Sequence, residues 1–222
     1  MADFRFLTDE QIVSVFDSFK ADNPSPKSEL EYLNAYTLLV AVVLSAQATD
    51  KSVNKATKPL FEKVTTPEQM IAFGEENLIE CIRSIGLYRS KARHVMELSR
   101  QLVEDYASQV PRTRDELMKL SGVGRKTANV VLNVVWGEKT MPVDTHILRI
   151  APRIGLSNGT TPESVEEDLI ARIPECYMEH AHHWLILHGR YVCTARKPAC
   201  LCDEAEGRKC CIAEICAKNG VL

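Results

Sequence analysis

Apolar residues recur at helical spacing from the first part of the chain onward. Thr8 and Gln11 form the pattern of a capping box, in which each side chain accepts a hydrogen bond from the other residue's backbone N–H. The apolar residues that follow are three or four positions apart and share one face of a helix. They are Ile12, Val15, Phe16 and Phe19. This segment predicts an amphipathic helix that packs on a core.

The most apolar stretch runs from Tyr36 to Gln47 and is rich in β-branched residues, so a buried strand is conceivable there. The pattern continues back to about Glu29, however, and that length favours a helix. We therefore expect a buried helix over 29–47.

Capping residues and helix breakers divide the remaining chain into further helices. Thr66-Pro67 and Thr161-Pro162 each place a capping side chain before a proline that suits the first helical position. Asp144 can cap a helix that begins at Thr145. The other expected helices span residues 50–63, 75–84, 90–107, 113–120, 125–135 and 175–192. No segment predicts a strand with conviction, so the expected fold class is all-α.

The composition of the chain is that of a globular protein. Its 222 residues are 45% hydrophobic and 26% charged, which excludes a mainly disordered, collagen-like or coiled-coil chain. The longest wholly apolar run, Leu38 to Leu44, is far shorter than the roughly 20 residues that span a membrane. The N-terminal segment carries charges and no apolar signal-peptide core. We therefore expect a cytosolic protein with no membrane partner, associated with the nucleoid if the source is bacterial.

Basic residues gather in two segments although the formal net charge is −3. Residues 82–100 carry five basic side chains against Glu97, and residues 188–202 carry three and no acid. A solvated helix face explains either segment alone, whereas two such segments are compatible with a basic face for a polyanion. The basic residues are Arg83, Arg89, Lys91, Arg93 and Arg100 in the first segment and Arg190, Arg196 and Lys197 in the second.

A glycine-containing turn lies between two of the expected helices, in the sequence LSGVGRKTA at 120–128. A phosphate-binding P-loop needs glycines where this chain has Leu120 and Arg125, and a dinucleotide-binding turn needs a preceding strand. A helix-hairpin-helix, which grips a nucleic-acid backbone with N–H groups, and a simple corner between two helices both remain open.

Lys126 follows this turn directly, where a lysine would face whatever the turn binds. It could be an ordinary phosphate contact or an amine nucleophile. An unperturbed lysine, with a pKa of about 10.4, pays roughly 4 kcal/mol to be neutral near pH 7.4. A helix N-terminus opposes the ammonium by no more than about 1–2 kcal/mol, so burial must supply the rest.

Asp144 lies eighteen residues beyond Lys126, in the sequence PVDTHI at 142–147. A single aspartate at a helix start is usually just an N-cap. It becomes catalytic only where the fold brings it beside the lysine, and there it would stabilise a cationic sugar or assist proton transfer.

Six of the eight cysteines lie in the last 30 residues, which in a reducing compartment indicates a metal site rather than disulfides. Four cysteines could hold zinc, although zinc sites usually contain C-x2-C pairs and this chain has none. Cys81 and Cys176 lie in apolar stretches and are expected in the core. The clustered residues are Cys193, Cys200, Cys202, Cys210, Cys211 and Cys216.

Four motifs, in this order along nearly the whole chain, resemble the endonuclease III family, a branch of the helix-hairpin-helix DNA glycosylases. They are LSAQATD at 44–50, LSGVGRKTANVVL at 120–132, VDTHI at 143–147 and HHWLILHGRYVC at 182–193. The resemblance implies two helical domains. The first is a six-helix domain over 28–138 that contains the hairpin, and the second combines 1–27 with 139–222.

The resemblance also implies a base excision repair enzyme that removes oxidised pyrimidines from duplex DNA and cuts abasic sites. Lys126 occupies the position of the nucleophile, which attacks C1′, forms a Schiff base and cuts the strand on the 3′ side by β-elimination. Asp144 occupies the position of the catalytic aspartate. Because Lys126 is present, the related adenine-excising branch is excluded. The implied DNA-binding residues are Gln47 and Leu87, which fill and wedge the gap left by a flipped nucleotide, with Gly122, Val123, Gly124, Arg125, Arg196 and Lys197.

In this family a [4Fe-4S] cluster is held by a C-x6-C-x2-C-x5-C run, and such clusters take four thiolates. Cys193 and Cys200 fit the first gap and Cys210 and Cys216 fit the last, but the middle gap is x9, so part of the loop is an insertion. We predict these four as ligands, with Cys202 and Cys211 as alternatives for the third and loss of the cluster also open. The cluster would hold Arg196 and Lys197 against DNA phosphates.

Two rival functions remain open. A non-catalytic helix-hairpin-helix DNA-binding protein would use Lys126 as a phosphate contact and Asp144 as a helix cap. A glycosylase that uses water as nucleophile would leave the abasic site uncut. A monomer is expected in each case.

Overall fold

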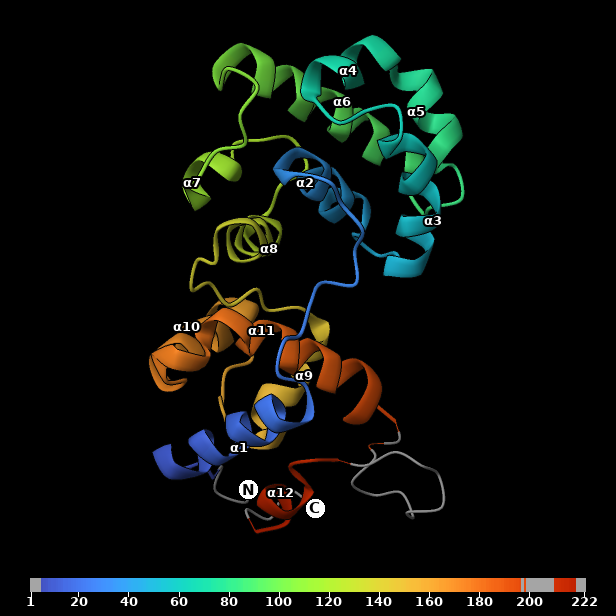
Figure 1. Cartoon of the computed structure of the whole chain (residues 1–222). Coiled ribbons are helices and arrows are strands. Elements are labelled where there is room, and N and C mark those ends of the chain that lie inside the picture. The colour runs from blue at the N-terminus through green and yellow to red at the C-terminus, as the bar shows by residue number, and fades with distance from the viewer. Residues whose placement is uncertain (1–4, 197, 199–209, 219–222) are drawn as a thin grey trace. The chain divides into compact units, whose positions relative to one another are not determined.

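The computed structural model describes residues 5–196, 198 and 210–218, and all regular structure within those ranges is helical (Figure 1). The predicted all-α fold class is therefore confirmed. The chain divides into two compact units. We call Ser28–Glu138 the hairpin unit, and Met1–Lys27 together with Lys139–Leu222 the cysteine unit. No helix in the described part of the chain is long and apolar enough to cross a membrane.

The hairpin unit contains seven helices, one more than the six-helix domain that the resemblance implies. The short helix capped by Thr113, which the sequence predicts over 113–120, is among them. Their bounds are α2 (Ala35–Leu44), α3 (Asp50–Phe61), α4 (Pro67–Phe73), α5 (Glu75–Ile82), α6 (Tyr88–Asp105), α7 (Arg114–Leu117) and α8 (Arg125–Trp136).

Helix α2 is the centre of the hairpin unit and contacts α3, α6 and α8. Every residue from Tyr36 to Leu44 is buried, so the apolar stretch is a buried helix, as predicted. The helix begins at Ala35, however, and not near Glu29. The reason is a capping box at Asn34. The Asn34 side chain accepts from the Thr37 backbone N–H, and the Thr37 side chain accepts from the Asn34 backbone N–H. The extended chain ends there and the helix begins.

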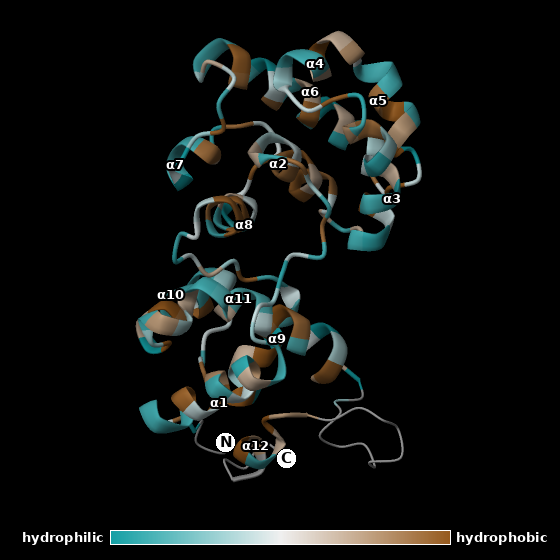
Figure 2. Ribbon diagram, in the orientation of Figure 1, coloured by the Kyte–Doolittle hydropathy of each residue, from teal (hydrophilic) through white to brown (hydrophobic). Residues whose placement is uncertain are grey.

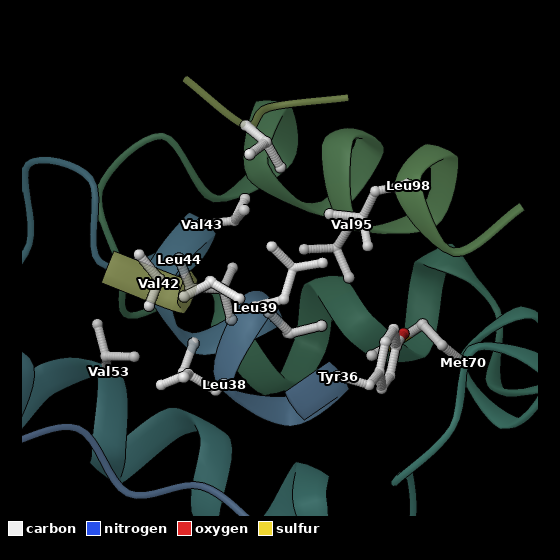
Figure 3. Close-up of a cluster of buried hydrophobic side chains, with 14 of the residues drawn as sticks. Tyr36, Leu38, Leu39, Val42, Val43, Leu44, Val53, Met70, Val95 and Leu98 are labelled. Atoms are coloured by element: carbon white, nitrogen blue, oxygen red, sulfur yellow. The ribbon is translucent and has the colours of Figure 1, made fainter. Parts of the chain in front are cut away.

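Side chains of α2 and α6 face one another in the core of this unit (Figure 3). Leu39 and Val43 lie toward Val95 and Leu98, and all four are buried. Fully burying an aliphatic side chain of this size contributes about 1.5–3 kcal/mol. The packing fixes α6 against the centre of the unit.

The cysteine unit is built from helices of both ends of the chain, and its helices carry hydrophobic and hydrophilic residues on different faces (Figure 2). The segment 175–192, predicted as one long helix, is a 3₁₀ turn, an α-helix and a π-helical turn in succession. The bounds are α1 (Asp9–Asp22), α9 (Thr145–Ile154), α10 (Pro162–Arg172), η1 (Glu175–Tyr177), α11 (Met178–Leu187), η2 (His188–Val192) and α12 (Ala213–Lys218).

Helix α1 is tied to the later part of the cysteine unit by both apolar and polar contacts. Its predicted apolar face is buried, and the ring of Phe16 stacks on Tyr177 with centroids 5.4 Å apart. Three hydrogen bonds reinforce this packing. They are Tyr177 Oη to Asp17 Oδ1 at 2.6 Å, Trp184 Nε1 to the Asn23 carbonyl at 2.8 Å and Arg172 Nη2 to the Leu7 carbonyl at 2.5 Å.

Candidate functional site

The turn between α7 and α8 requires glycine at Gly122. Its φ is +77°, in the left-handed region, and a Cβ added there would lie 2.8 Å from Cβ of His94. The next residue, Val123, has a buried side chain, and its backbone N–H donates to the Leu120 carbonyl at 3.1 Å. The side chain of Val123 is thus part of the core, and the predicted DNA contact at this residue stays a prediction.

Arg125 and Lys126 are the first two residues of α8, and both side chains are half-buried. The preceding residue, Gly124, is exposed and supplies no side-chain cap. A helix N-terminus carries a partial positive charge, and here no acidic side chain lies in the first turn to offset it. This end of α8 is therefore electropositive and suited to an anion, which is the geometry of a helix-hairpin-helix.

Gln47 and Leu87 share an unusual backbone conformation within the hairpin unit. Both side chains are exposed, and their φ angles are +54° and +59°. Left-handed conformations are unfavourable for residues with a Cβ by roughly 1–2 kcal/mol, so they persist where the surroundings or a function require them. The sequence analysis named Gln47 and Leu87 only through the resemblance. No local sequence pattern predicted their left-handed conformations.

Asp144 is the N-cap of α9 and is half-buried. Its Oδ1 accepts from the backbone N–H groups of His146 and Ile147, both at 2.9 Å. Within the described residues its Oδ2 has no hydrogen-bond partner. The carboxylate therefore caps a helix through one oxygen alone. Because Asp144 belongs to the cysteine unit and Lys126 to the hairpin unit, their predicted pairing stays a prediction.

Three of the predicted metal ligands lie in or against one apolar cluster of the cysteine unit. Cys193 and Cys216 are buried, and Cys210 is half-buried against the same cluster. No three of the described Cys, His, Asp and Glu residues form a metal-binding group by themselves. The fourth predicted ligand, Cys200, lies outside the described residues, as do Cys202 and Lys197, whereas Arg196 is described and exposed.

Two arginines of α9 contact the segment around Cys193, and the sequence analysis missed them. Arg149 Nη2 donates to the carbonyls of Gly189 at 2.6 Å and Cys193 at 3.2 Å. Arg153 Nη1 donates to the Cys193 sulfur at 3.4 Å and to the Thr194 carbonyl at 3.0 Å. A metal ligand is commonly oriented by a hydrogen-bond donor outside the coordination sphere, so this donor environment fits a metal centre with cysteine ligands. Their spacing of four on one helix was the available signal.

Comparisons with known proteins agree with this geometry. Residues 40–175 match a family described as "HhH-GPD superfamily base excision DNA repair protein". Endonuclease III of Treponema pallidum is 53% identical over 217 residues, which are 98% of this chain and 100% of that protein. Endonuclease III of Escherichia coli K12 is 47% identical over 188 residues, which are 85% of this chain and 89% of that protein.

Two solved structures are similar in both sequence and fold. A trapped endonuclease III–DNA covalent intermediate has a TM-score of 0.82 and 46% identity, covering 91% of this chain and 99% of its own. A non-covalent endonuclease III–DNA complex has a TM-score of 0.83 and 45% identity, covering 91% and 98%. The chain therefore belongs to the HhH-GPD superfamily of base excision DNA repair proteins and, within it, to the endonuclease III family.

Proposed function

We propose that this protein excises oxidised pyrimidines from duplex DNA and cuts the resulting abasic site, with Lys126 as the nucleophile. One observation carries the proposal. Lys126 is the second residue of α8, directly beyond a glycine turn of helix-hairpin-helix geometry. The similar structure of a trapped covalent intermediate supports it, because such a species requires a nucleophile on the protein.

In the proposed reaction the neutral amine of Lys126 attacks C1′ of the damaged nucleotide, and the base leaves with the electron pair of the glycosidic bond. Ring opening and loss of protons from the nitrogen give a Schiff base. Removal of a C2′ proton then breaks the C3′–O bond, which is β-elimination on the 3′ side. The electropositive N-terminus of α8 disfavours the ammonium form and so assists the first step.

Asp144 is proposed to act through its charge. A carboxylate near C1′ stabilises the positive charge that develops on the sugar as the base departs, and it can also assist the proton transfers. The capping bonds of Oδ1 hold the side chain in one orientation and do not engage Oδ2, which is the oxygen proposed to act on the sugar. Positioning by a rigid helix end is what such electrostatic stabilisation needs.

Gln47 and Leu87 are proposed to occupy the gap that a flipped nucleotide leaves in the duplex. Both are exposed and held in left-handed conformations, which project their side chains from tight turns. Flipping costs a few kcal/mol and costs least at damaged, poorly stacked bases, so it contributes to the selection of lesions.

The cysteine unit is proposed to hold a [4Fe-4S] cluster through Cys193, Cys200, Cys210 and Cys216. The burial of Cys193 and Cys216, the packing of Cys210 against the same cluster and the Arg153 contact support this ligand set. When bound, the cluster supplies four thiolate–iron bonds that fix the loop. That loop would present Arg196 and Lys197 to DNA phosphates, and the protein would act on duplex DNA as a monomer.

Borohydride trapping tests the proposal. Duplex DNA with one oxidised pyrimidine is incubated with the protein and sodium borohydride, which reduces a Schiff base to a stable covalent adduct. The wild type should give a protein–DNA band that is lost in Lys126→Ala and kept in Lys119→Ala, an exposed lysine in the segment before the turn. An intact lesion with no band would instead identify a DNA-binding protein. Base loss with no band would identify a glycosylase that uses water.

A further inference from the structure

One face of α6 supports the hairpin turn through polar side chains. His94 and Gln101 are seven residues apart, close to two helical turns, so they lie on the same face of α6. Their contacts are with the segment just before the glycine turn, on a different part of the chain. Neither residue belongs to the motifs that identify the family.

Ser121 is bound by both of these side chains. Its backbone N–H donates to Gln101 Oε1 at 2.8 Å, and its Oγ lies 3.0 Å from His94 Nδ1. The amide of Gln101 also donates through Nε2 to the Lys119 carbonyl at 3.3 Å. Gln101 thus pairs with a backbone donor, the Ser121 N–H, and a backbone acceptor, the Lys119 carbonyl, while His94 pairs with the Ser121 hydroxyl.

Gly122 rests directly on the same histidine. A Cβ on Gly122 would lie 2.8 Å from the His94 Cβ and 3.0 Å from its Cγ, so backbone and imidazole are in close contact. The position of the turn is therefore set by the side chain of His94 as well as by the left-handed conformation of Gly122. Any movement of His94 would move the turn that leads into α8.

The His94–Ser121 hydrogen bond can form with either tautomer of the imidazole ring. A serine hydroxyl can donate to a ring nitrogen that carries no hydrogen and can accept from a ring N–H. A side chain of similar size without a polar atom, such as leucine, would fill the space and leave the hydroxyl without this partner.

We propose that His94 and Gln101 are positioning residues for DNA binding, which hold the hairpin so that the N-terminus of α8 meets the phosphate backbone. This inference rests on the proposed function, because it assigns the hairpin to a DNA contact. Neither side chain touches the reacting atoms. Their effect is on the affinity for DNA, since a turn that moves loses its aligned N–H groups.

A set of substitutions at His94 and Ser121 tests the proposal. Affinity is measured at fixed salt for a duplex that contains a tetrahydrofuran abasic analogue, and strand cutting is measured at saturating duplex with a true abasic site. His94→Leu should weaken binding about 5- to 30-fold, the equivalent of one or two lost hydrogen bonds, and leave the cutting rate at saturation within about twofold. His94→Asn, whose amide reaches the position of Nδ1, should restore most of the affinity.

A double-mutant cycle separates the hydrogen bond from general destabilisation. If the bond positions the turn, the double variant His94→Leu, Ser121→Ala should bind no more than about twofold worse than the weaker single variant. Gln101→Leu should weaken binding as well, and Glu104→Gln, an exposed change on the same helix, should not. Circular dichroism and Tm confirm that each variant is folded.

The outcomes distinguish this inference from the proposed function. A wild-type protein that neither binds nor traps the DNA would overturn the proposed function. A wild type that traps, together with a folded His94→Leu variant of unchanged affinity, would overturn the positioning role alone. The positioning role is also overturned if the two single effects add in the double variant, or if cutting at saturation falls as much as binding.

Discussion

The carboxylate of Asp144 and the backbone N–H of Ile147 are joined by a hydrogen bond of 2.9 Å, and the same oxygen, Oδ1, also accepts from His146. One carboxylate oxygen thus begins α9, and the other has no partner among the residues that the structure describes. The helix-capping role and the proposed chemical role of Asp144 therefore involve different atoms of one side chain. Substitutions can separate the two roles.

Asp144→Asn should preserve the fold and abolish most of the activity. The asparagine oxygen still accepts the capping bonds, so the free energy of unfolding should change by less than about 0.5 kcal/mol. The charge is lost, so Schiff-base formation should slow by about 100-fold or more. Asp144→Ala should slow the reaction similarly and also lose about 1 kcal/mol of stability. Chemical denaturation and borohydride trapping measure both effects, and equal stability losses in the two variants would contradict the separation of roles.

Arg153→Leu should loosen the metal centre proposed in the cysteine unit. The substitution removes the donor to the Cys193 sulfur and to the Thr194 carbonyl. Such a donor orients a metal ligand, and losing it commonly weakens metal binding about 10- to 100-fold. Iron content and visible absorbance, followed in the presence of a chelator, should both decline faster than in the wild type.

The matched comparison for that experiment is Arg149→Leu. In the segment around Cys193, Arg149 donates to the carbonyls of Gly189 and Cys193 and not to the cysteine sulfur. It should therefore affect the stability of the unit more than the rate of iron loss. Identical iron loss in the wild type and in Arg153→Leu would show that the sulfur contact does not matter.

Leu87→Gly should raise stability and lower repair of a lesion. Leu87 is 63% exposed, so its removal gives up little packing, and glycine relieves a left-handed conformation worth about 1 kcal/mol. The side chain proposed to fill the duplex gap is lost at the same time. Excision of an oxidised pyrimidine should fall more than cutting of a preformed abasic site, whose nucleotide needs less help to leave the stack. A fall in denaturation midpoint, or equal losses on the two substrates, would argue against this role.

Lowering the pH should destabilise the cysteine unit through His183. Burial, with a smaller contribution from His180, lowers the pKa of His183 from 6.5 to about 4. The folded state therefore binds the proton less well than the unfolded state, and stability is lost as pH falls from 6.5 toward 4. Between pH 7 and about pH 5 the loss from this residue is on the order of 2 kcal/mol.

His183→Leu provides the test of that pH dependence. Nδ1 of His183 is buried and has no hydrogen-bond partner within the described residues, so leucine leaves no polar group unsatisfied there. At pH 7 the variant should be as stable as the wild type or more so. Its Tm should fall less than that of the wild type on acidification, and parallel pH curves would refute the assignment.

The sequence predicts the helices well where a side chain sets their ends. Thr8, Thr66 and Thr161 each accept a hydrogen bond from the first turn of the helix that they were predicted to cap. The predicted start of α2 was wrong because Asn34 was not recognised as a cap inside a continuous apolar pattern. Of the apolar residues before this cap, Leu30 is buried but Tyr32 and Leu33 are exposed, so the apolar pattern there indicates neither a helix nor a continuous buried face.

The candidate site was predicted only in part, since its supporting contacts are tertiary. Lys126 could be found because its motif is contiguous, whereas the arginines that contact Cys193 lie on another helix. Cys81 packs against the core as expected, but Cys176 is exposed, because the 3₁₀ turn η1 places it on the surface. Neither the arginine contacts with Cys193 nor the exposure of Cys176 can be predicted from the local sequence.

The cysteine unit is assembled from two stretches of chain that are separated by the whole hairpin unit. During synthesis α1 leaves the ribosome before the hairpin unit, whereas its partners Tyr177 and Trp184 are made after it. The hairpin unit, by contrast, has all its helices available once residue 138 has emerged. The apolar face of α1 therefore stays exposed through most of translation, until residues 177–184 can pack on it. A chain truncated before those residues could not bury this face.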